Sequence, residues 1–142
     1  MTQKRRVRIG IENLSFDASH YTPGVETECE NLHGHTFIVN VEVEGEVDEK
    51  GMVLDFSELK KIVKEVLSSW DHSIIVPKQD IDKIKLEGVF KVKIKVIDYA
   101  FATTEYIAIS IAKEIYEKTK LPVKVRVYEG LNKYASASYP AR

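Results

Sequence analysis

The chain has 142 residues, 44% hydrophobic and 30% charged, with a formal net charge of -1 at pH 7. This composition is typical of one globular domain, expected over residues 1–142, and argues against a general nucleic-acid binder. No apolar run approaches the ~20 residues of a membrane span. The single cysteine cannot form an internal disulfide, which favours a cytoplasmic location.

The N-terminal half predicts two long strands. Apolar and polar residues alternate over most of residues 6–20 and again over residues 36–47. This period of two is typical of an antiparallel sheet with one covered face. Pro23, Gly24 and their polar neighbours predict a loop between the two strands.

Two amphipathic helices and further strands follow. Ser57 is a good N-cap for the first helix, and the second is expected to begin near Thr103 or Thr104. Alternation predicts strands over residues 88–100, 123–130 and 133–140.

The simplest packing of these elements is an α+β layer. Two antiparallel helices would lie on one side of an antiparallel sheet of four or more strands. The edges of such a sheet need protection, which favours a homo-oligomer. Residues 73–102 form a long segment that is either an extra hairpin or surface decoration.

Three histidines point to a metal site. His33 and His35 are two apart at the start of a strand, so their side chains share one face. His20 ends the preceding strand, which in an antiparallel pair lies near the start of the next. Three histidines with an open fourth position are typical of catalytic rather than structural zinc.

Cys29 lies four residues before His33 and leaves three alternatives open. As a fourth zinc ligand it would close the site to substrate. As a thiolate near a metal ion it could act as a base or nucleophile. It could also be a bystander in the loop.

The fourth histidine follows a carboxylate in the pair Asp71-His72. A carboxylate beside an imidazole can orient it for acid–base chemistry. Adjacent residues of a regular strand point to opposite faces, so this role requires a turn.

Other polar residues end a strand and begin a helix. Glu129 closes an apolar strand, where its carboxylate is either solvated or reads the donor–donor edge of a heterocycle. Thr103, Thr104 and Glu105 open the second helix, where they either cap it or help a polar ligand to bind at its N-terminus.

Taken together, these segments resemble the 6-pyruvoyltetrahydropterin synthase / 6-carboxytetrahydropterin synthase family. The resemblance spans nearly the whole chain and is carried, in order, by FDASH, CENLHGHTF, GMVLDFSELK, WDH, TTE and VYEG. It implies a tunnelling fold, in which two helices cover a four-stranded antiparallel sheet. It also implies that trimers close the sheets into a barrel and that two trimers stack into a hexamer.

The resemblance also implies roles for individual residues. Zinc would be held by His20, His33 and His35, and Cys29 would be the proton-abstracting base. The pterin ring would be anchored by Glu129, helped by Thr103, Thr104 and Glu105, and protons would be relayed by Asp71 and His72.

The implied reaction is loss of triphosphate from 7,8-dihydroneopterin triphosphate, giving a 6-pyruvoyl- or 6-carboxytetrahydropterin. The short spacing from Cys29 to His33 is similar to that of the carboxy-pterin branch, which serves queuosine synthesis. Some microbial relatives instead place a glutamate in this loop and cleave the side chain to a 6-hydroxymethyl pterin, a role that Glu30 could serve. A non-catalytic pterin- or purine-binding barrel is the remaining alternative.

Overall fold

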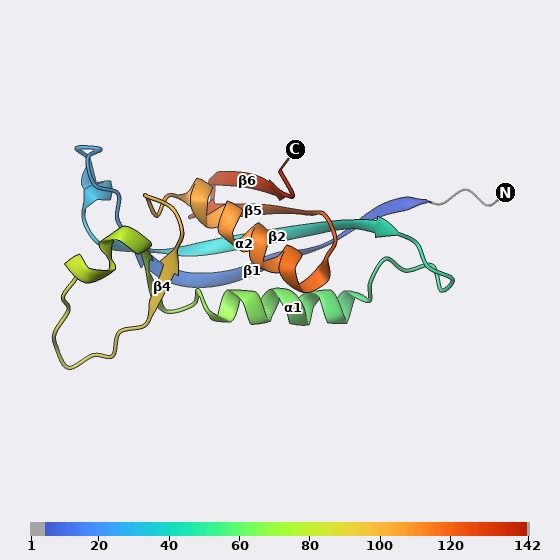
Figure 1. Ribbon diagram of the computed structural model, residues 1–142, viewed down its shortest axis with the longest axis horizontal. Coiled ribbons are helices and arrows are strands. Elements are labelled where there is room, and N and C mark those ends of the chain that lie inside the picture. The colour runs from blue at the N-terminus through green and yellow to red at the C-terminus, as the bar shows by residue number, and fades with distance from the viewer. Residues whose placement is uncertain (1–4, 142) are drawn as a thin grey trace.

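The computed structural model describes residues 5–141. Figure 1 shows two helices lying across a long, twisted sheet. In chain order the elements are β1 (Arg6–His20), η1 (Glu28–Glu30), β2 (His33–Glu46), α1 (Phe56–Ser68), β3 (Ser73–Pro77), η2 (Lys78–Lys83), β4 (Ile94–Ile97), α2 (Thr104–Thr119), β5 (Val123–Glu129) and β6 (Lys133–Tyr139).

The sheet has six strands in the order β4-β3-β1-β2-β5-β6. The antiparallel set β1, β2, β5 and β6 is the expected one. The total of four strands that the family resemblance implied was wrong, because β3 and β4 extend the sheet beyond β1 as parallel strands. The short β3 is apolar at most positions and largely buried, so it lacks the alternation by which a half-covered strand is predicted.

The segment between α1 and α2 also differs from expectation. Of the strand expected over residues 88–100, only Ile94–Ile97 is confirmed. Because β3 and β4 run parallel, the segment 73–102 is not a hairpin. The connection from β3 to β4 consists of η2 and a loop. This connection lies at the end of the sheet where β1 ends (Figure 1).

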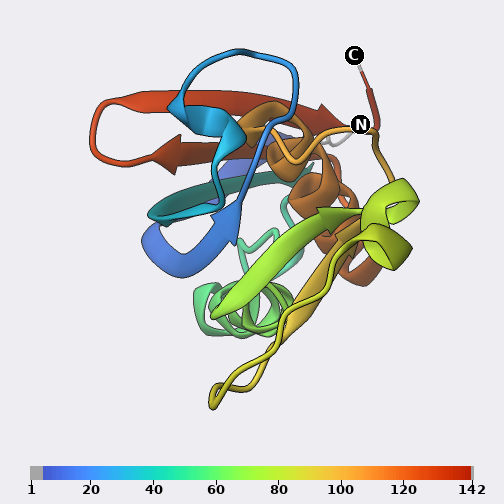
Figure 2. The ribbon, with the colours of Figure 1, turned by 90° about the vertical axis from the view of Figure 1, so that its left-hand side faces the viewer.

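Both helices cover the same face of the sheet (Figure 2). α1 packs against β1, while α2 packs against β5 and β6. Among residues 5–141 neither helix combines the length and apolar character needed to cross a bilayer. The side chains that α2 buries are Thr104, Ile107, Ala108, Ile111, Ala112 and Ile115, and α1 buries Leu59, Val63, Val66 and Leu67.

The caps of the two helices differ in how well they were predicted. Thr103 is the N-cap of α2, as expected. Ser57 was the wrong N-cap for α1, because the helix begins two residues earlier than that cap would allow, at Phe56. Asp55 has extended backbone and its carboxylate accepts a hydrogen bond from the Ser57 backbone N–H at 2.8 Å, so Asp55 is the cap.

A β-bulge in β1 decides which side chains face the core. The register shifts by one residue between Ile11, opposite Val41, and Leu14, opposite Val39. Asn13 lies in the extra position with φ 63°, and its backbone N–H donates to Oδ1 of Asn40 at 2.8 Å. Since side chains alternate with a period of two, this one extra residue moves all later even-numbered residues of β1 to the helix-covered face.

Candidate active site

His20 and His33 meet as direct partners across β1 and β2. Phe16 and Phe37 are paired in the same way on the helix-covered face, and both are buried. His35 lies two residues from each of His33 and Phe37, so it shares that face. Without the bulge at Asn13, His20 would point to the other face of the sheet and the three imidazoles would not converge.

A four-residue cluster forms where these strands end. His20, His33, His35 and Glu129 each offer one ligand atom, and these atoms all lie within 4.8 Å of one another. The ring centroids of His20 and His33 are 4.7 Å apart, and those of His33 and His35 are 4.8 Å apart. The sequence therefore predicted the three histidines of a group that could hold a metal ion.

Two ring nitrogens in the cluster are buried without a hydrogen-bond partner among the described residues: Nε2 of His20 and Nε2 of His35. Nε2 of His35 does lie 2.7 Å from Oε1 of Glu129, but this contact lacks the directionality of a hydrogen bond. Buried polar atoms are usually paired, so such orphaned atoms require an explanation. A metal ion bound between the rings would supply the missing partner.

The opposite ring nitrogens are held by backbone carbonyls. Nδ1 of His20 lies 2.7 Å from the Ala102 carbonyl oxygen, and Nδ1 of His33 lies 2.6 Å from that of Asn31. A carbonyl only accepts, so each Nδ1 carries the proton and each Nε2 carries the lone pair. Metal-binding histidines commonly have this outer hydrogen bond.

Burial favours the metal-binding form of two of these histidines. Desolvation lowers the pKa of His20, against an opposing effect of its hydrogen bond to Ala102. Desolvation likewise lowers the pKa of His35. Both imidazoles are thereby favoured as neutral groups, and a neutral ring nitrogen is the metal ligand.

Glu129 is the member of the cluster that sequence reasoning assigned elsewhere. It was expected to contact a ligand at the end of β5, and its proximity to the histidines was missed. The signal lies in the strand pairing: Glu129 is opposite Phe37 on β2, and so lies beside His35. Burial alone would raise the pKa of Glu129, but the Thr104 hydroxyl and the neighbouring histidines lower it overall.

The three predicted residues at the start of α2 differ in whether they contact the histidine cluster. Thr104 is buried, and its hydroxyl donates to Oε2 of Glu129 at 2.6 Å. The Thr103 side chain caps α2 by accepting from the Tyr106 backbone N–H. Glu105 is exposed in the first turn. Of the three predicted residues, only Thr104 is bonded to the cluster.

Cys29 and Glu30 lie in η1, within the exposed loop that joins β1 to β2. Cys29 is not part of the four-residue metal cluster. Its backbone carbonyl accepts from the Thr22 N–H at 2.7 Å. The Glu30 carboxylate accepts from the Gly24 N–H at 2.8 Å, which closes the loop.

Asp71 and His72 form the expected pair through a turn. Oδ2 of Asp71 is 2.9 Å from Nδ1 of His72, whose backbone has φ 58°. Asp71 is anchored to β1, since its Oδ1 accepts from the Asp17 N–H at 2.9 Å. This hydrogen bond and the imidazole of His72 lower the pKa of Asp71.

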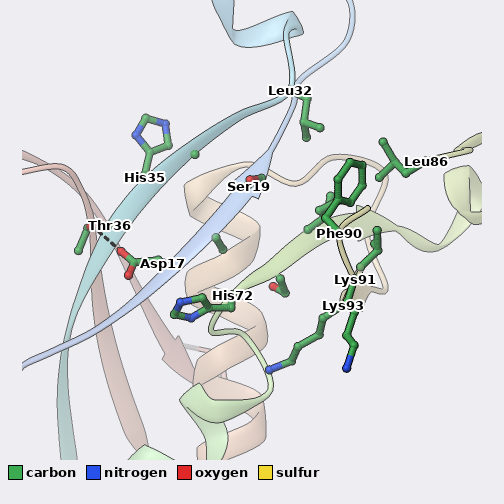
Figure 3. A pocket seen from close by; sticks show the side chains of 15 residues that line it. Asp17, Ser19, Leu32, His35, Thr36, His72, Leu86, Phe90, Lys91 and Lys93 are labelled. Atoms are coloured by element: carbon green, nitrogen blue, oxygen red, sulfur yellow. Dashed lines mark hydrogen bonds between the residues drawn. The ribbon is translucent and has the colours of Figure 1, made fainter. Parts of the chain in front are cut away.

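The pair faces a different part of the sheet from the histidine cluster. His72 lines a pocket of about 640 Å³ together with Asp17, Ser19 and Thr36 (Figure 3). His35 also borders this pocket, but its ring lies on the far side of β2 from His72. Asp17 is paired with Thr36, one position from the buried Phe16–Phe37 pair, so these side chains point to the opposite face. Within one chain, the pair and the metal cluster therefore open on opposite faces.

A profile of the 6-pyruvoyl tetrahydropterin synthase family matches residues 10–140. The chain belongs to this family. The 6-carboxy-5,6,7,8-tetrahydropterin synthase of Haemophilus influenzae is 36% identical over 115 residues, which is 77% of this chain and 79% of that protein. The dihydroneopterin monophosphate aldolase of Pyrococcus furiosus is 52% identical over 62 residues, which is 44% of this chain and 52% of that protein.

The solved structures agree with this family on the fold. The 6-pyruvoyl tetrahydropterin synthase of Plasmodium falciparum superposes with a TM-score of 0.77 at 25% identity, covering 94% of this chain and 97% of that one. The α+β tunnelling fold expected from the sequence is thus confirmed, with a six-stranded rather than a four-stranded sheet.

Proposed function

We propose that this member of the 6-pyruvoyl tetrahydropterin synthase family is a zinc-dependent pterin lyase. Its substrate would be 7,8-dihydroneopterin triphosphate. Loss of triphosphate alone would give a 6-pyruvoyltetrahydropterin, whereas a 6-carboxytetrahydropterin would also require uptake of water and release of the two outer side-chain carbons as acetaldehyde. The observation that carries the proposal is the convergence of His20, His33 and His35 on one face, with two Nε2 atoms buried and unpartnered. A metal ion held there would polarise a neighbouring substrate oxygen and so ease removal of a proton from the adjacent carbon.

The three histidines would hold zinc through ring nitrogens. Nitrogen ligands suit this ion, and a site with three protein ligands leaves one position for substrate. When bound, zinc supplies Lewis-acid chemistry: it polarises the substrate's side-chain oxygens and so acidifies the adjacent C–H bond. The carbonyls of Ala102 and Asn31 fix the rings of His20 and His33 in the orientation that this requires.

Cys29 is the proposed base that removes the proton. It lies on the loop between two strands that both carry histidines of the cluster, outside the cluster itself. The thiolate is the reactive form of cysteine. With Cys29 outside the cluster, the fourth coordination position of the metal stays open to the substrate. If Cys29 were a fourth ligand, it would occupy that position.

Asp71 and His72 are the proposed proton relay. The Asp71 carboxylate fixes the imidazole orientation through the 2.9 Å contact, and the exposed ring can exchange protons with substrate. Because the pair and the cluster face opposite ways in one chain, the relay is proposed to serve the metal centre of another copy. In the homohexamer that the family resemblance implies, a dimer of trimers, such an active site would lie between subunits.

Glu129 is the proposed anchor of the pterin ring. Its Oε2 is fixed by the Thr104 hydroxyl, and the lowered pKa keeps the carboxylate ionised. An ionised carboxylate accepts two hydrogen bonds from a guanidine-like edge, as a pterin presents. Thr103 and Glu105, at the start of the same helix, are proposed to complete the ring site.

Product identification tests this proposal. Zinc-loaded protein is incubated with 7,8-dihydroneopterin and, separately, with its triphosphate, and the products are identified by mass spectrometry. The expected result is a 6-pyruvoyl- or 6-carboxytetrahydropterin from the triphosphate only. Pterin binding without any product would instead support a non-catalytic pterin-binding barrel.

A second candidate function is cleavage of the dihydroneopterin side chain to a 6-hydroxymethyl dihydropterin. The 52% identity over 62 residues to a dihydroneopterin monophosphate aldolase supports it. Glu30, next to Cys29 in η1, would then be the base. In the product assay this function gives a 6-hydroxymethyl dihydropterin, and the monophosphate should be included as a third substrate.

A further inference from the structure

The segment of residues 78–102 links β3 to α2 and contains η2 and β4. It carries none of the residues proposed to bind metal or to transfer protons. From the sequence, this region was expected to be either part of an extra hairpin or surface decoration. In the structure, however, two parts of it meet the end of β1, where His20 and Tyr21 lie.

The first contact is with His20 itself. The Ala102 carbonyl accepts the Nδ1 proton of His20 at 2.7 Å, and Ala102 is fully buried. The position of this carbonyl is fixed from both sides along the chain. Thr103 caps α2 just after it, and the ring of Tyr99 stacks on that of Tyr106 at a centroid distance of 4.3 Å.

The second contact is with the neighbouring residue. The Tyr21 hydroxyl donates to Oδ2 of Asp80, in η2, at 2.7 Å. Both side chains are partly buried. The Gln79 side-chain amide also reaches the Ala100 carbonyl, at 3.4 Å. Thus η2 contacts both the end of β1 and the chain that leads to Ala102.

These contacts form a closed circuit around His20. β1 continues from His20 to Tyr21, the Tyr21–Asp80 bond leads to η2, and the segment returns to His20 through Ala102. Pairing of β1 with β3 ends at Ser19 and pairing with β2 ends at His20, so from Tyr21 onward this circuit restrains the chain beyond the sheet. Since Nε2 of His20 points into the metal cluster, ring orientation depends on these restraints.

We propose that the segment 78–102 positions His20 for metal binding, with the Tyr21–Asp80 hydrogen bond as its anchor. Tyr21 and Asp80 are positioning residues: they touch neither metal nor substrate but fix the strand end on which a metal ligand lies. The inference rests on the proposed metal centre and extends it. Loss of an outer-shell partner of a metal-binding histidine typically weakens affinity by about 10–100-fold.

The test measures zinc affinity rather than activity. The full-length protein and its variants compete for zinc with a chromophoric chelator, and the melting temperature without zinc reports on folding. Tyr21→Phe and Asp80→Ala should each bind zinc about 10-fold more weakly, at the lower end of the outer-shell range because they act through one further residue. The double variant should be no weaker than either single variant, since both remove one bond.

Two variants separate positioning from general damage. Asp80→Asn keeps an acceptor oxygen for the Tyr21 hydroxyl, so its zinc affinity should stay near that of the wild type. Tyr116→Phe removes a hydroxyl from α2, about three turns from the start of the helix, and should leave zinc affinity unchanged.

The inference is overturned if Tyr21→Phe and Asp80→Ala bind zinc as tightly as the wild type, or if Tyr116→Phe weakens binding equally. Failure of the proposed function gives different results. If His33→Ala bound zinc like the wild type, the metal centre itself would be wrong. Tight zinc binding by a wild-type protein that forms no product would disprove the lyase and leave the positioning role intact.

Discussion

His20 and His33 lie opposite each other in the β1–β2 register, with ring centroids 4.7 Å apart. Their Nδ1 atoms are both held by backbone carbonyls, so their Nε2 atoms carry the lone pairs. Cross-strand pairing therefore creates a two-nitrogen metal site, and His35 supplies the third nitrogen from the same face. This relationship underlies the predictions on metal and catalysis.

The first prediction concerns the metal. His33→Ala removes one of three nitrogen ligands, so the purified variant should lose most of its zinc. Elemental mass spectrometry measures this as the number of zinc ions per chain. His72→Ala is the matched control, because His72 lies outside the cluster. It should retain zinc. Equal zinc loss in both variants would show that the effect is not specific to the site.

The second prediction separates the two proposed bases. Cys29→Ala should keep zinc but lose turnover of the triphosphate by about 10²–10⁴-fold, the usual contribution of a positioned base. Glu30→Gln retains an oxygen that can accept from the Gly24 N–H and should leave this reaction largely intact. If instead Glu30→Gln lost activity and Cys29→Ala kept it, Glu30 would be the base and the side-chain cleavage would be favoured.

The sequence predicted more of this site than of the surrounding sheet. Alternation correctly located β1 and β2, and antiparallel pairing then brought His20 to His33. The bulge at Asn13 was not predicted, although it determines the face on which His20 lies. This bulge combines one residue with positive φ and a side-chain acceptor on the next strand, and neither feature is visible in a pattern of apolar residues.

Other parts were missed for different physical reasons. β3 was not predicted because a strand covered on both sides shows no alternation. The place of Glu129 beside the histidines depends on the register between β2 and β5, which lie far apart in sequence. Asp55 and Ser57 are both good N-cap residues, and only the extended backbone at Asp55 decides between them.

The third prediction concerns acid stability. Hydrogen bonds from the side chain and backbone N–H of Ser57 lower the pKa of Asp55 below its usual value of 3.8. A carboxyl with a lowered folded-state pKa stabilises the fold above its unfolded pKa, and that contribution is lost as pH falls through the folded pKa.

Asp55→Asn is the variant for this test, because asparagine is also a good N-cap but does not titrate. Its melting temperature should fall less steeply than that of the wild type below about pH 4, near the unfolded pKa of aspartate. Some acid sensitivity should remain, since the pKa values of Asp48 and Asp71 are also lowered. Identical acid profiles for both proteins would contradict the role of Asp55.

The fourth prediction concerns the core. Ile111 is fully buried between α2 and the sheet, so Ile111→Ala should reduce the free energy of unfolding by about 2–5 kcal/mol through lost apolar burial and a cavity. Leu131 is 89% exposed, and Leu131→Ala should change it by less than about 0.5 kcal/mol. Denaturant unfolding at one fixed protein concentration measures both. Similar losses in the two variants would argue against the packing described.

The central claim is that zinc on His20, His33 and His35 is required for turnover of the pterin substrate. The most direct measurement is the rate of product formation from 7,8-dihydroneopterin triphosphate by protein stripped with a chelator and then titrated with zinc. The stripped protein should show no turnover, and activity should recover fully at one zinc per chain. Undiminished turnover by the metal-free protein would contradict it.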